Sequence, residues 1–383
     1  MKNKIIGVLL LLFALNAFSQ NYQYKTISEK SLTAGIVFKK ITESTMPWSI
    51  NLAEIDLNAP GLQIMAVTAF DSLAGNRMTS AMAADQKKKG MNVRVATNAD
   101  FYEEGGYSTN YLVADGQLVS MAHKGFSAIG FDNQNKPFIN HVNFESLIIT
   151  PNSRHKISGI NKERLQDELI VYNRFNGKST RTNKWGAEAQ LRLLGTPLVN
   201  DTLIAVVEKK QKQRGNMAIP ENKIVMSGHD QSALWINEML KAGDTVKLVI
   251  SLNGMPENLE DLLGGFTQLV KNGKNSAMQS FEEEGNPAVR ERFALARHPR
   301  TAVGFNKEKS KLFLMTVDGR QPASAGMTLE ELGDYMTGLG CWQALNFDGG
   351  GSTTMVIDGK VVNVPSDPTG ERAVATALMI IKN

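Results

Sequence analysis

The feature that most constrains this chain is the run NFDGGGSTT at residues 346–354. Gly349, Gly350 and Gly351 free the backbone from the steric limits that a Cβ imposes, so this loop can bring several N–H groups up to one anion. It joins a helical pattern at residues 328–339 to a strand pattern at residues 355–357. A tight turn between strands and an anion-binding loop both fit this local sequence.

Most of the remaining patterns are typical of short strands. Alternating or continuous apolar runs occur at residues 34–38, 48–57, 62–70, 93–97, 169–174, 189–194, 203–210, 223–227, 246–252, 301–305, 311–317 and 373–381. Helical spacing is confined to residues 78–90, 232–241 and 328–339, the last opened by a capping box of Thr328 and Glu331. Residues 258–263 fit a helical turn, residues 175–186 fit a polar loop, and residues 278–297 fit an exposed connection. We therefore predict an α+β fold: a strand-dominated single large domain with mixed or antiparallel sheets and a few helices.

The N-terminus has the pattern of an export signal. Lys2 and Lys4 precede an apolar stretch at residues 5–15, and a small-x-small site at residues 17–19 precedes Gln20. The apolar stretch is well short of the ~20 residues that span a bilayer. We predict a signal peptide at residues 1–19, a mature domain at residues 20–383 without a stable membrane span, and a periplasmic or secreted location.

Charge and cysteine usage narrow the possible partners. The chain has 42 basic and 38 acidic residues, a balance that does not favour nucleic acid. The single cysteine, Cys341, cannot form an intramolecular disulfide and is predicted to be buried in an apolar patch. The spacing of His, Cys and acidic residues predicts no metal site or other cofactor, although a divalent cation held by Asp348 and its neighbours stays open. The oligomeric state also stays open.

Five polar clusters adjoin predicted strands, where a sheet can direct several side chains into one pocket. The clusters are Asn98 with Asp100, His298 with Arg300 and Thr301, Asp318 with Arg320, Asp348 with the glycines, and Glu371 with Arg372. Each cluster alone is typical of a turn or a surface pair. Together, with two arginines ahead of the glycine loop, they predict one polar pocket.

Several of these motifs, in this order, resemble the phosphodiester glycosidase family. They are RHPRTAVG at residues 297–304, DGR at 318–320, SAGMTL at 324–329 and NFDGGGSTTM at 346–355. The resemblance is dense over residues 297–383 and looser from about Ala34. It implies an exported hydrolase that acts in carbohydrate metabolism and cleaves a sugar-1-phosphodiester into a free sugar and a phosphomonoester. One departure is NADFY at residues 98–102, where the family usually has NGGFF, so the sugar specificity is not carried over.

The resemblance also implies roles for the site residues. Arg300 and Arg320 suit bidentate phosphate binding, and the amides of Gly349, Gly350 and Gly351 can line the same anion. Asp348 is the first candidate for nucleophile or base. The other candidate catalytic groups are Asp100, which replaces a family glycine, His298 as a general acid or a packing residue, and Asp318, which can instead pair with Arg300 or fix a turn. The remaining candidate substrate-binding residues are Asn98, Thr301, Ser352, Thr353 and Arg372.

Two other functions fit the same residues. One is a non-catalytic glycan-binding or envelope-polysaccharide assembly protein that uses the same pocket. The other is an ordinary glycosidase that uses Asp100 and another carboxylate on neutral glycosides. All three readings predict a carbohydrate or sugar-phosphate ligand.

Overall fold

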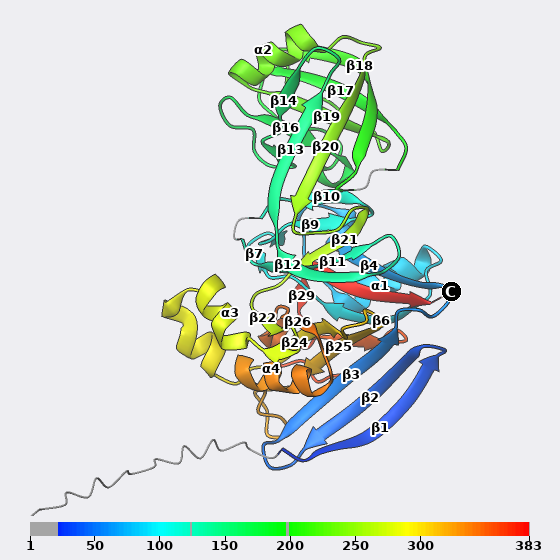
Figure 1. Cartoon of the computed structure of the whole chain (residues 1–383), viewed down its shortest axis with the longest axis vertical. Helices are drawn as coiled ribbons and strands as arrows, with labels where there is room; N and C mark the ends of the chain where they lie inside the picture. Colours follow the sequence, from blue (N-terminus) through cyan, green and yellow to red (C-terminus); the bar gives the residue numbers. More distant parts are fainter. Residues whose placement is uncertain (1–21, 123–124, 197–198, 383) are drawn as a thin grey trace, which may run out of the picture.

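The computed structural model describes residues 22–122, 125–196 and 199–382, which form two lobes stacked along the long axis of the molecule (Figure 1). The predicted signal peptide and the predicted cleavage point before Gln20 lie outside the described residues. Residues 143–196 and 199–253, green in Figure 1, build the upper lobe. The chain enters it along β13 (Asn143–Ile149) and leaves along β20 (Thr245–Asn253), and these two strands pair antiparallel.

The largest sheet of the lower lobe has eight strands. Their spatial order is β1 (Tyr24–Thr33), β2 (Ile36–Glu43), β3 (Trp48–Asp56), β25 (Lys311–Val317), β24 (Arg300–Phe305), β26 (Gln343–Asn346), β22 (Gln268–Lys271) and β23 (Lys274–Asn275). Arg300 pairs with Val317, and Ala302 pairs with Asn346. Because both pairings are antiparallel, the start of β24 lies beside the ends of β25 and β26. This register gathers three of the predicted polar clusters at one edge of the sheet.

Two five-stranded sheets complete the core of the lower lobe. One contains β28 (Lys360–Val361), β27 (Met355–Ile357), β6 (Val93–Asn98), β30 (Thr376–Lys382) and β4 (Leu62–Thr68), and the other β10 (Gln117–Ser120), β9 (Leu112–Ala114), β21 (Leu259–Gly264), β11 (Ser127–Asp132) and β12 (Pro137–His141). Two small pairs are β5 (Arg77–Met78) with β29 (Ala373–Val374), and β7 (Tyr102–Glu103) with β8 (Tyr107–Ser108). Buried side chains from all three large sheets, among them Val95, Ile129 and Val303, pack into one apolar core that holds the lobe together.

The upper lobe is a single eight-stranded sheet with a helix packed on it. Its order is β14 (Arg154–Lys156), β13, β20, β18 (Thr202–Lys212), β17 (Ala187–Leu194), β19 (Lys223–Gly228), β16 (Leu169–Tyr172) and β15 (Gly159–Ile160). Helix α2 (Asp230–Met239) buries Ala233 and Ile236 in the core of this lobe. Hydrogen bonds from two side-chain amides fix the upper lobe onto β10. Asn161 Nδ2 donates to Val119 O at 2.9 Å, and Asn173 Nδ2 donates to Leu118 O at 2.9 Å.

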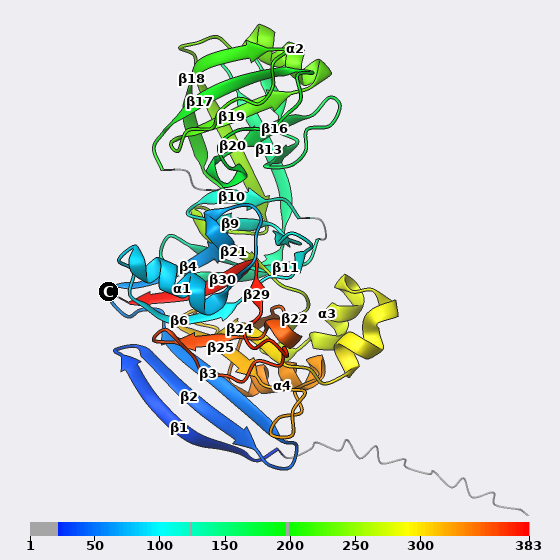
Figure 2. The ribbon, with the colours of Figure 1, turned by 180° about the vertical axis from the view of Figure 1, so that it is seen from behind.

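Two helices of the lower lobe agree with their sequence signals. Helix α1 (Thr79–Lys88) lies against the sheet of β6 and β30 (Figure 2) and packs Met82 and Ala83 beside Ala96. Helix α4 (Leu329–Gly338) begins with the predicted capping box. The Thr328 hydroxyl accepts from Glu331 N at 3.1 Å, and the Glu331 carboxylate accepts from Thr328 N at 2.9 Å.

Two local predictions are wrong. The helical turn predicted at residues 258–263 is instead occupied by strand β21 (Leu259–Gly264), because a strand buried on both faces lacks the alternation that identifies a strand. The prediction of an exposed connection at residues 278–297 missed regular structure: the stretch contains most of helix α3 (Ala277–Glu284), the 3₁₀ turn η3 (Pro287–Val289) and the π-helical turn η4 (Glu291–Leu295). Helix α3 is short and buries only Ala277, Ser280 and Phe281, so its periodic signal is weak.

The predicted strand-dominated α+β fold with mixed and antiparallel sheets is confirmed. The only parallel pair among the named strands of the described residues is β15 with β16. Cys341 is buried, as predicted, and this burial raises the pKa of its thiol to about 12. None of the helices within residues 22–122, 125–196 and 199–382 has the length and apolar character needed to cross a bilayer.

Candidate active site

Part of the predicted set converges on a pocket of about 380 Å³ at the edge of the eight-stranded sheet of the lower lobe. We call it the arginine pocket. It is lined by Val289, Arg292, Phe293, His298, Arg300, Arg320, Asp348, Gly349 and Gly350. Six of these residues belong to the set predicted from the sequence, and the strand register explains why they meet.

Arg300 is the buried cation of the pocket. It is 2% exposed; Nε donates to Met327 O at 2.9 Å, and Nη2 donates to Phe293 O at 2.7 Å and Ala296 O at 3.2 Å. Burial, and then the nearby Arg320, lower the pKa of its guanidinium to about 9. None of the described hydrogen bonds uses Nη1, and no carboxylate pairs with Arg300 among the described residues. The site therefore holds a cation whose charge a bound anion would balance.

Arg320 and His298 form the second cationic element. The backbone of Arg320 is left-handed, with φ of 61°, and its Nη2 lies 3.0 Å from His298 Nδ1. His298 Nε2 lies 2.5 Å from Arg292 O. Because a guanidinium only donates and a carbonyl only accepts, these contacts fix a neutral imidazole protonated on Nε2. Burial and the charges of Arg300 and Arg320 lower the pKa of His298. Both ring nitrogens are thus occupied, an arrangement that favours positioning Arg320 over general acid catalysis.

The three glycines allow close packing around Asp348. A Cβ at Gly349 would lie 2.7 Å from Pro299 O, and one at Gly350, where φ is 61°, would lie 3.1 Å from Arg320 Nη2. At Gly351 a Cβ would lie 2.3 Å from Arg372 Nη2, so only glycine lets that guanidinium cover the loop.

The loop amides are less available than the sequence suggests. Gly349 N donates to Asp348 Oδ1 at 2.9 Å, and Gly350 N donates to Pro299 O at 2.9 Å. Of the three amides, only that of Gly351 makes no described hydrogen bond, and Gly351 is buried. The anion-binding capacity of the pocket therefore lies mainly in its arginines.

Asp348 is the only carboxylate among the residues that line the arginine pocket. Its backbone is fixed by the bond from Asp348 N to Ala99 O at 2.9 Å and by Asn98 Nδ2, which donates to Asp348 O at 2.6 Å. Burial of the carboxyl raises its pKa to about 6, while Arg372 acts in the opposite direction. Near neutral pH the group is mainly ionised, yet its proton affinity is higher than that of an ordinary aspartate, which suits a nucleophile or a base.

Asn98 and Thr301 lie behind the pocket and hold its wall together. Both are fully buried, and Asn98 Oδ1 accepts from Thr301 Oγ1 at 2.8 Å and from Thr354 N at 3.0 Å. One amide thus connects the ends of β6 and β24 to both sides of the glycine loop. We assign these two residues to positioning Asp348.

Asp318 and Asp100 are buried outside the arginine pocket. Asp318 accepts from Ser49 Oγ and Val364 N, each at 3.1 Å, and fixes the turn that carries Arg320. Burial raises the pKa of its carboxyl. Of the two structural roles open for Asp318, the contacts favour fixing the turn, because the described hydrogen bonds of Arg300 all go to main-chain oxygens.

The Asp100 carboxylate is 1% exposed and accepts from Ser108 Oγ and, at 2.7 Å, from Asn110 Nδ2. Burial raises its pKa to about 7. The residues that line the arginine pocket do not include it. A role as the acid or base of that pocket has no geometric support.

The other predicted contacts flank the glycine loop. Ser352 and Thr353 follow the glycines, are each 1% exposed and are not among the residues that line the arginine pocket. Arg372 covers Gly351 and pairs with Asp367, with Nε and Nη2 each 2.7 Å from Oδ2. Glu371 lies away from the pocket, where its carboxylate accepts from Ser80 N at 2.8 Å at the start of α1.

Arg292, Phe293 and Val289 were missed by the sequence analysis. They come from η3 and η4, in the stretch predicted to be an exposed connection. Phe293 stacks near Arg300, with the guanidinium carbon 5.3 Å from the ring centroid. The sequence of this stretch is rich in charged residues and shows no periodic apolar pattern, so nothing in it identified these three residues.

Two further observations concern the chemistry of the described residues. Within residues 22–122, 125–196 and 199–382, no group of three or more His, Cys, Asp or Glu side chains is placed to hold a metal ion.

A larger cavity of about 650 Å³ lies between the lobes, and none of the predicted site residues is among the described residues that line it.

Comparison with known sequences agrees with the motifs. Residues 198–381 match the family model described as phosphodiester glycosidase. The N-acetylglucosamine-1-phosphodiester alpha-N-acetylglucosaminidase of Bos taurus is 36% identical over 110 residues, which is 28% of this chain and 20% of the bovine protein. The human enzyme of the same name is 29% identical over 160 residues, covering 40% of this chain and 30% of the human protein. The chain thus matches less than a third of the length of either relative.

Comparison with a solved structure extends the similarity over nearly the whole chain. The catalytic domain of the zebrafish N-acetylglucosamine-1-phosphodiester alpha-N-acetylglucosaminidase, solved in a form auto-inhibited by its pro-peptide, aligns with a TM-score of 0.50 and 16% identity, over 94% of this chain and 88% of that domain. At this identity the similarity concerns the fold alone.

Proposed function

Residues 198–381 of this chain belong to the phosphodiester glycosidase family, and from that premise we propose that the protein hydrolyses a sugar-1-phosphodiester to a free sugar and a phosphomonoester. One observation carries the proposal. The arginine pocket places Arg292, Arg300 and Arg320 around a single carboxylate, Asp348. Such a pocket is complementary to a phosphate next to a carbon at which positive charge develops.

The arginines bind the phosphodiester group in this proposal. Arg320 reaches the pocket from a turn fixed by Asp318 and is oriented by His298. Arg300 is held by three main-chain carbonyls, which leaves Nη1 for an anion. A guanidinium that is already immobilised loses little entropy when it binds phosphate, and its planar donors match the phosphate oxygens.

The reaction breaks the bond between C1 of the sugar and the phosphate oxygen. The electron pair of that bond goes to the oxygen, so the phosphomonoester leaves as its dianion without strong protonation. A neutral glycoside needs an acid to protonate its leaving group as well as a second carboxylate. The presence of one carboxylate among the lining residues therefore favours a phosphodiester over a neutral glycoside.

Asp348 supplies the remaining chemistry. As a base it takes a proton from water while the water oxygen bonds to C1; as a nucleophile it bonds to C1 itself, and water then releases the sugar. Both routes require the ionised carboxylate. The hydrogen bond from Gly349 N and the main-chain contacts to Ala99 and Asn98 keep the group in place for either route.

We place this activity outside the cytoplasm, on the basis of the signal-like pattern at residues 1–19. N-terminal sequencing of the protein recovered from the periplasm or medium of the producing cell checks this. A mature chain that begins at Gln20 is expected, and an intact N-terminus would contradict it.

A binding-only role for the same pocket is the second candidate, favoured by the departure at Asp100. The experiment that separates the two is incubation of the purified chain with a synthetic sugar-1-phosphodiester and analysis of the products by NMR. Catalysis is expected to give equal amounts of free sugar and phosphomonoester. Saturable binding of the substrate without product over a long incubation would contradict hydrolysis and leave the binding role.

A further inference from the structure

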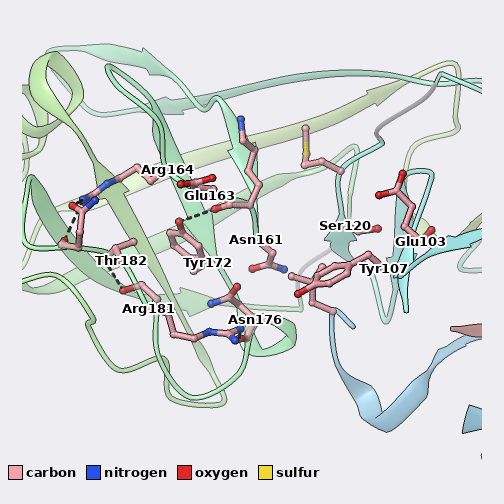
Figure 3. A pocket seen from close by; sticks show the side chains of 16 residues that line it. Glu103, Tyr107, Ser120, Asn161, Glu163, Arg164, Tyr172, Asn176, Arg181 and Thr182 are labelled. Carbon is pink, nitrogen blue, oxygen red and sulfur yellow. Dashed lines mark hydrogen bonds between the residues drawn. The ribbon is translucent and has the colours of Figure 1, made fainter. Parts of the chain in front are cut away.

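The cavity of about 650 Å³ between the lobes, here called the inter-lobe cavity, has the construction of a second ligand site. Figure 3 shows its labelled side chains. The upper lobe contributes Tyr172 and the loop that follows it, and the lower lobe contributes the β7–β8 hairpin and Ser120. Its volume falls within the range of about 300–1,000 Å³ that is typical of small-molecule sites.

Buried hydrogen bonds hold the upper-lobe wall. Glu188 is 1% exposed, and its carboxylate accepts from Thr180 Oγ1 at 2.8 Å, Thr182 Oγ1 at 2.8 Å and Met217 N at 3.0 Å. Arg164 is 5% exposed and donates to Asn183 Oδ1 at 2.7 Å. Residues 180–183 are thus fixed before any ligand arrives, which lowers the entropy cost of binding.

The cavity presents hydrogen-bonding groups with spare capacity. Asn176 Nδ2 donates to Ser179 O at 2.9 Å, while its Oδ1 makes none of the described bonds. Tyr172 OH donates to Lys162 O at 2.7 Å and Ser120 Oγ donates to Asn110 O at 3.1 Å, so each hydroxyl can still accept. These amides and hydroxyls are the partners that sugar hydroxyls use.

The opposite wall carries an aromatic ring. Tyr107, on β8, is 43% exposed and lines the cavity, and Figure 3 shows it across from Asn161 and Asn176. A Cβ at Gly105 would lie 3.2 Å from the ring, so glycine there leaves room for the ring. A pyranose has an apolar C–H face and a rim of hydroxyls, which fits an aromatic platform opposite hydrogen-bonding side chains.

The charges of the cavity oppose an anion as its main ligand. Among the lining residues the acidic ones are Glu103 and Glu163 and the basic ones Lys162, Arg164 and Arg181. Lys162 pairs with Glu168 at 2.7 Å, and Arg164 donates hydrogen bonds to Asn183, Trp185 and Ser227. Two of the three basic side chains thus already have protein partners.

One chain segment connects the two cavities. At one end of residues 98–108, Asn98 binds the backbone of Asp348, and Phe101 packs against Phe293 of the arginine pocket with ring centroids 6.1 Å apart. At the other end Ser108 lines the inter-lobe cavity and donates to Asp100. We propose that the inter-lobe cavity binds neutral saccharide units of the substrate, away from the bond that is cut. The link to the substrate rests on the proposed function, whereas the saccharide site does not.

Titration calorimetry with neutral tetrasaccharides tests the site without any hydrolysis. The probes are the β1,4-linked tetramers of glucose and N-acetylglucosamine, the α1,4-linked tetramer of glucose and a linear α-mannotetraose. We expect at least one to bind, and Tyr107→Ala to weaken that binding about tenfold or more while Tyr107→Phe retains most of it. Tyr24→Ala, at a tyrosine of similar exposure (41%) on β1, is the matched control and should bind as the wild type does.

The outcomes are distinct. The site would be overturned if none of the four sugars bound. It would also be overturned if Tyr107→Ala and Tyr24→Ala bound the sugar with equal affinity while both variants kept the wild-type melting temperature. Should Tyr107→Ala not fold, Asn176→Ala takes its place in the test. The same tenfold weakening is expected for it, and an unchanged affinity would contradict the site. Saccharide binding in a protein that does not hydrolyse a phosphodiester would contradict only the proposed function.

Discussion

The arginine pocket and the inter-lobe cavity differ in the charge of their lining residues, and this difference separates two kinds of recognition. The arginine pocket has three arginines and one carboxylate among its lining residues, whereas the inter-lobe cavity has two acids and three bases, most of them paired or held by the protein. Excess positive charge on immobilised side chains suits a phosphate. Balanced charge with amides, hydroxyls and a tyrosine ring suits hydroxyl groups.

The carboxylates of the two regions show the same contrast. Asp348 faces the arginine pocket with one main-chain donor on Oδ1, and Asp100 is enclosed between Ser108 and Asn110 behind the wall of the inter-lobe cavity. Burial raises the pKa of both, to about 6 and about 7. A raised pKa therefore does not identify a catalytic group; its access to a pocket does.

The largest expected effect is at Asp348. Asp348→Asn keeps the shape and the acceptor for Gly349 N but removes the charge, so kcat should fall by roughly 10²–10⁴-fold while substrate binding is retained. Steady-state kinetics and calorimetry measure the two quantities. The surface variant Asp334→Asn is the control and should be active. Wild-type turnover in Asp348→Asn would remove the distinction between the two carboxylates.

A smaller effect is expected at Arg320. Loss of a charge-assisted bond to phosphate should lower kcat/KM by roughly ten- to a hundredfold in Arg320→Ala. Arg320→Lys should restore little, because a point charge does not reproduce the planar fork. His298→Ala should give a weaker defect of the same kind, since His298 acts through Arg320. A defect in His298→Ala larger than that of Arg320→Ala would instead support acid catalysis by the imidazole.

The pH dependence of activity sharpens the assignment of Asp348. Its folded-state pKa of about 6 means that the ionised fraction, and with it kcat/KM, should rise as pH increases through about 6. An aspartate with an ordinary pKa would be fully ionised by pH 5. A profile of kcat/KM from pH 4 to 8 measures the rising limb. A flat profile across this range would contradict a carboxylate with this pKa as base or nucleophile.

The smallest effect on activity, but a clear one on stability, is expected at Asp100. Its folded-state pKa is raised, so the folded protein binds the proton more tightly than the unfolded chain does. The stability from this proton is fully present below the unfolded pKa near 4 and is lost as pH rises through about 7. The free energy of unfolding of Asp100→Asn should therefore increase, relative to that of the wild type, as pH rises from 4 to 8. Urea unfolding at both pH values tests this, and parallel changes in the two proteins would contradict it.

The sequence predicted the meeting of His298, Arg300, Arg320 and Asp348 because each follows or precedes a strand of one antiparallel sheet. It did not separate lining residues from supporting ones. Asn98 and Asp348 are 250 residues apart in the chain, and only the pairing of distant strands makes the first a support for the second. Hydrogen-bond partners at such separations leave no local pattern.

The inter-lobe cavity and Arg292 were missed for related reasons. The residues that line the cavity are scattered along the chain between Leu73 and Asn183. They come from both lobes and meet only after the lobes pack together. Arg292 lies on a single π-helical turn, too short to produce a periodic signal. Short elements and surfaces between lobes are where sequence patterns carry the least information.

Hydrolysis of a sugar-1-phosphodiester in ¹⁸O-labelled water tests the central claim most directly. If Asp348 and the arginines promote cleavage of the C1–O bond, the label enters the sugar and the phosphomonoester contains none. Mass spectrometry of the phosphomonoester reads this result without interference from later exchange at C1 of the sugar. Label in the phosphate would mean that the P–O bond is cut, and the arginine pocket would then belong to a phosphodiesterase rather than a glycosidase.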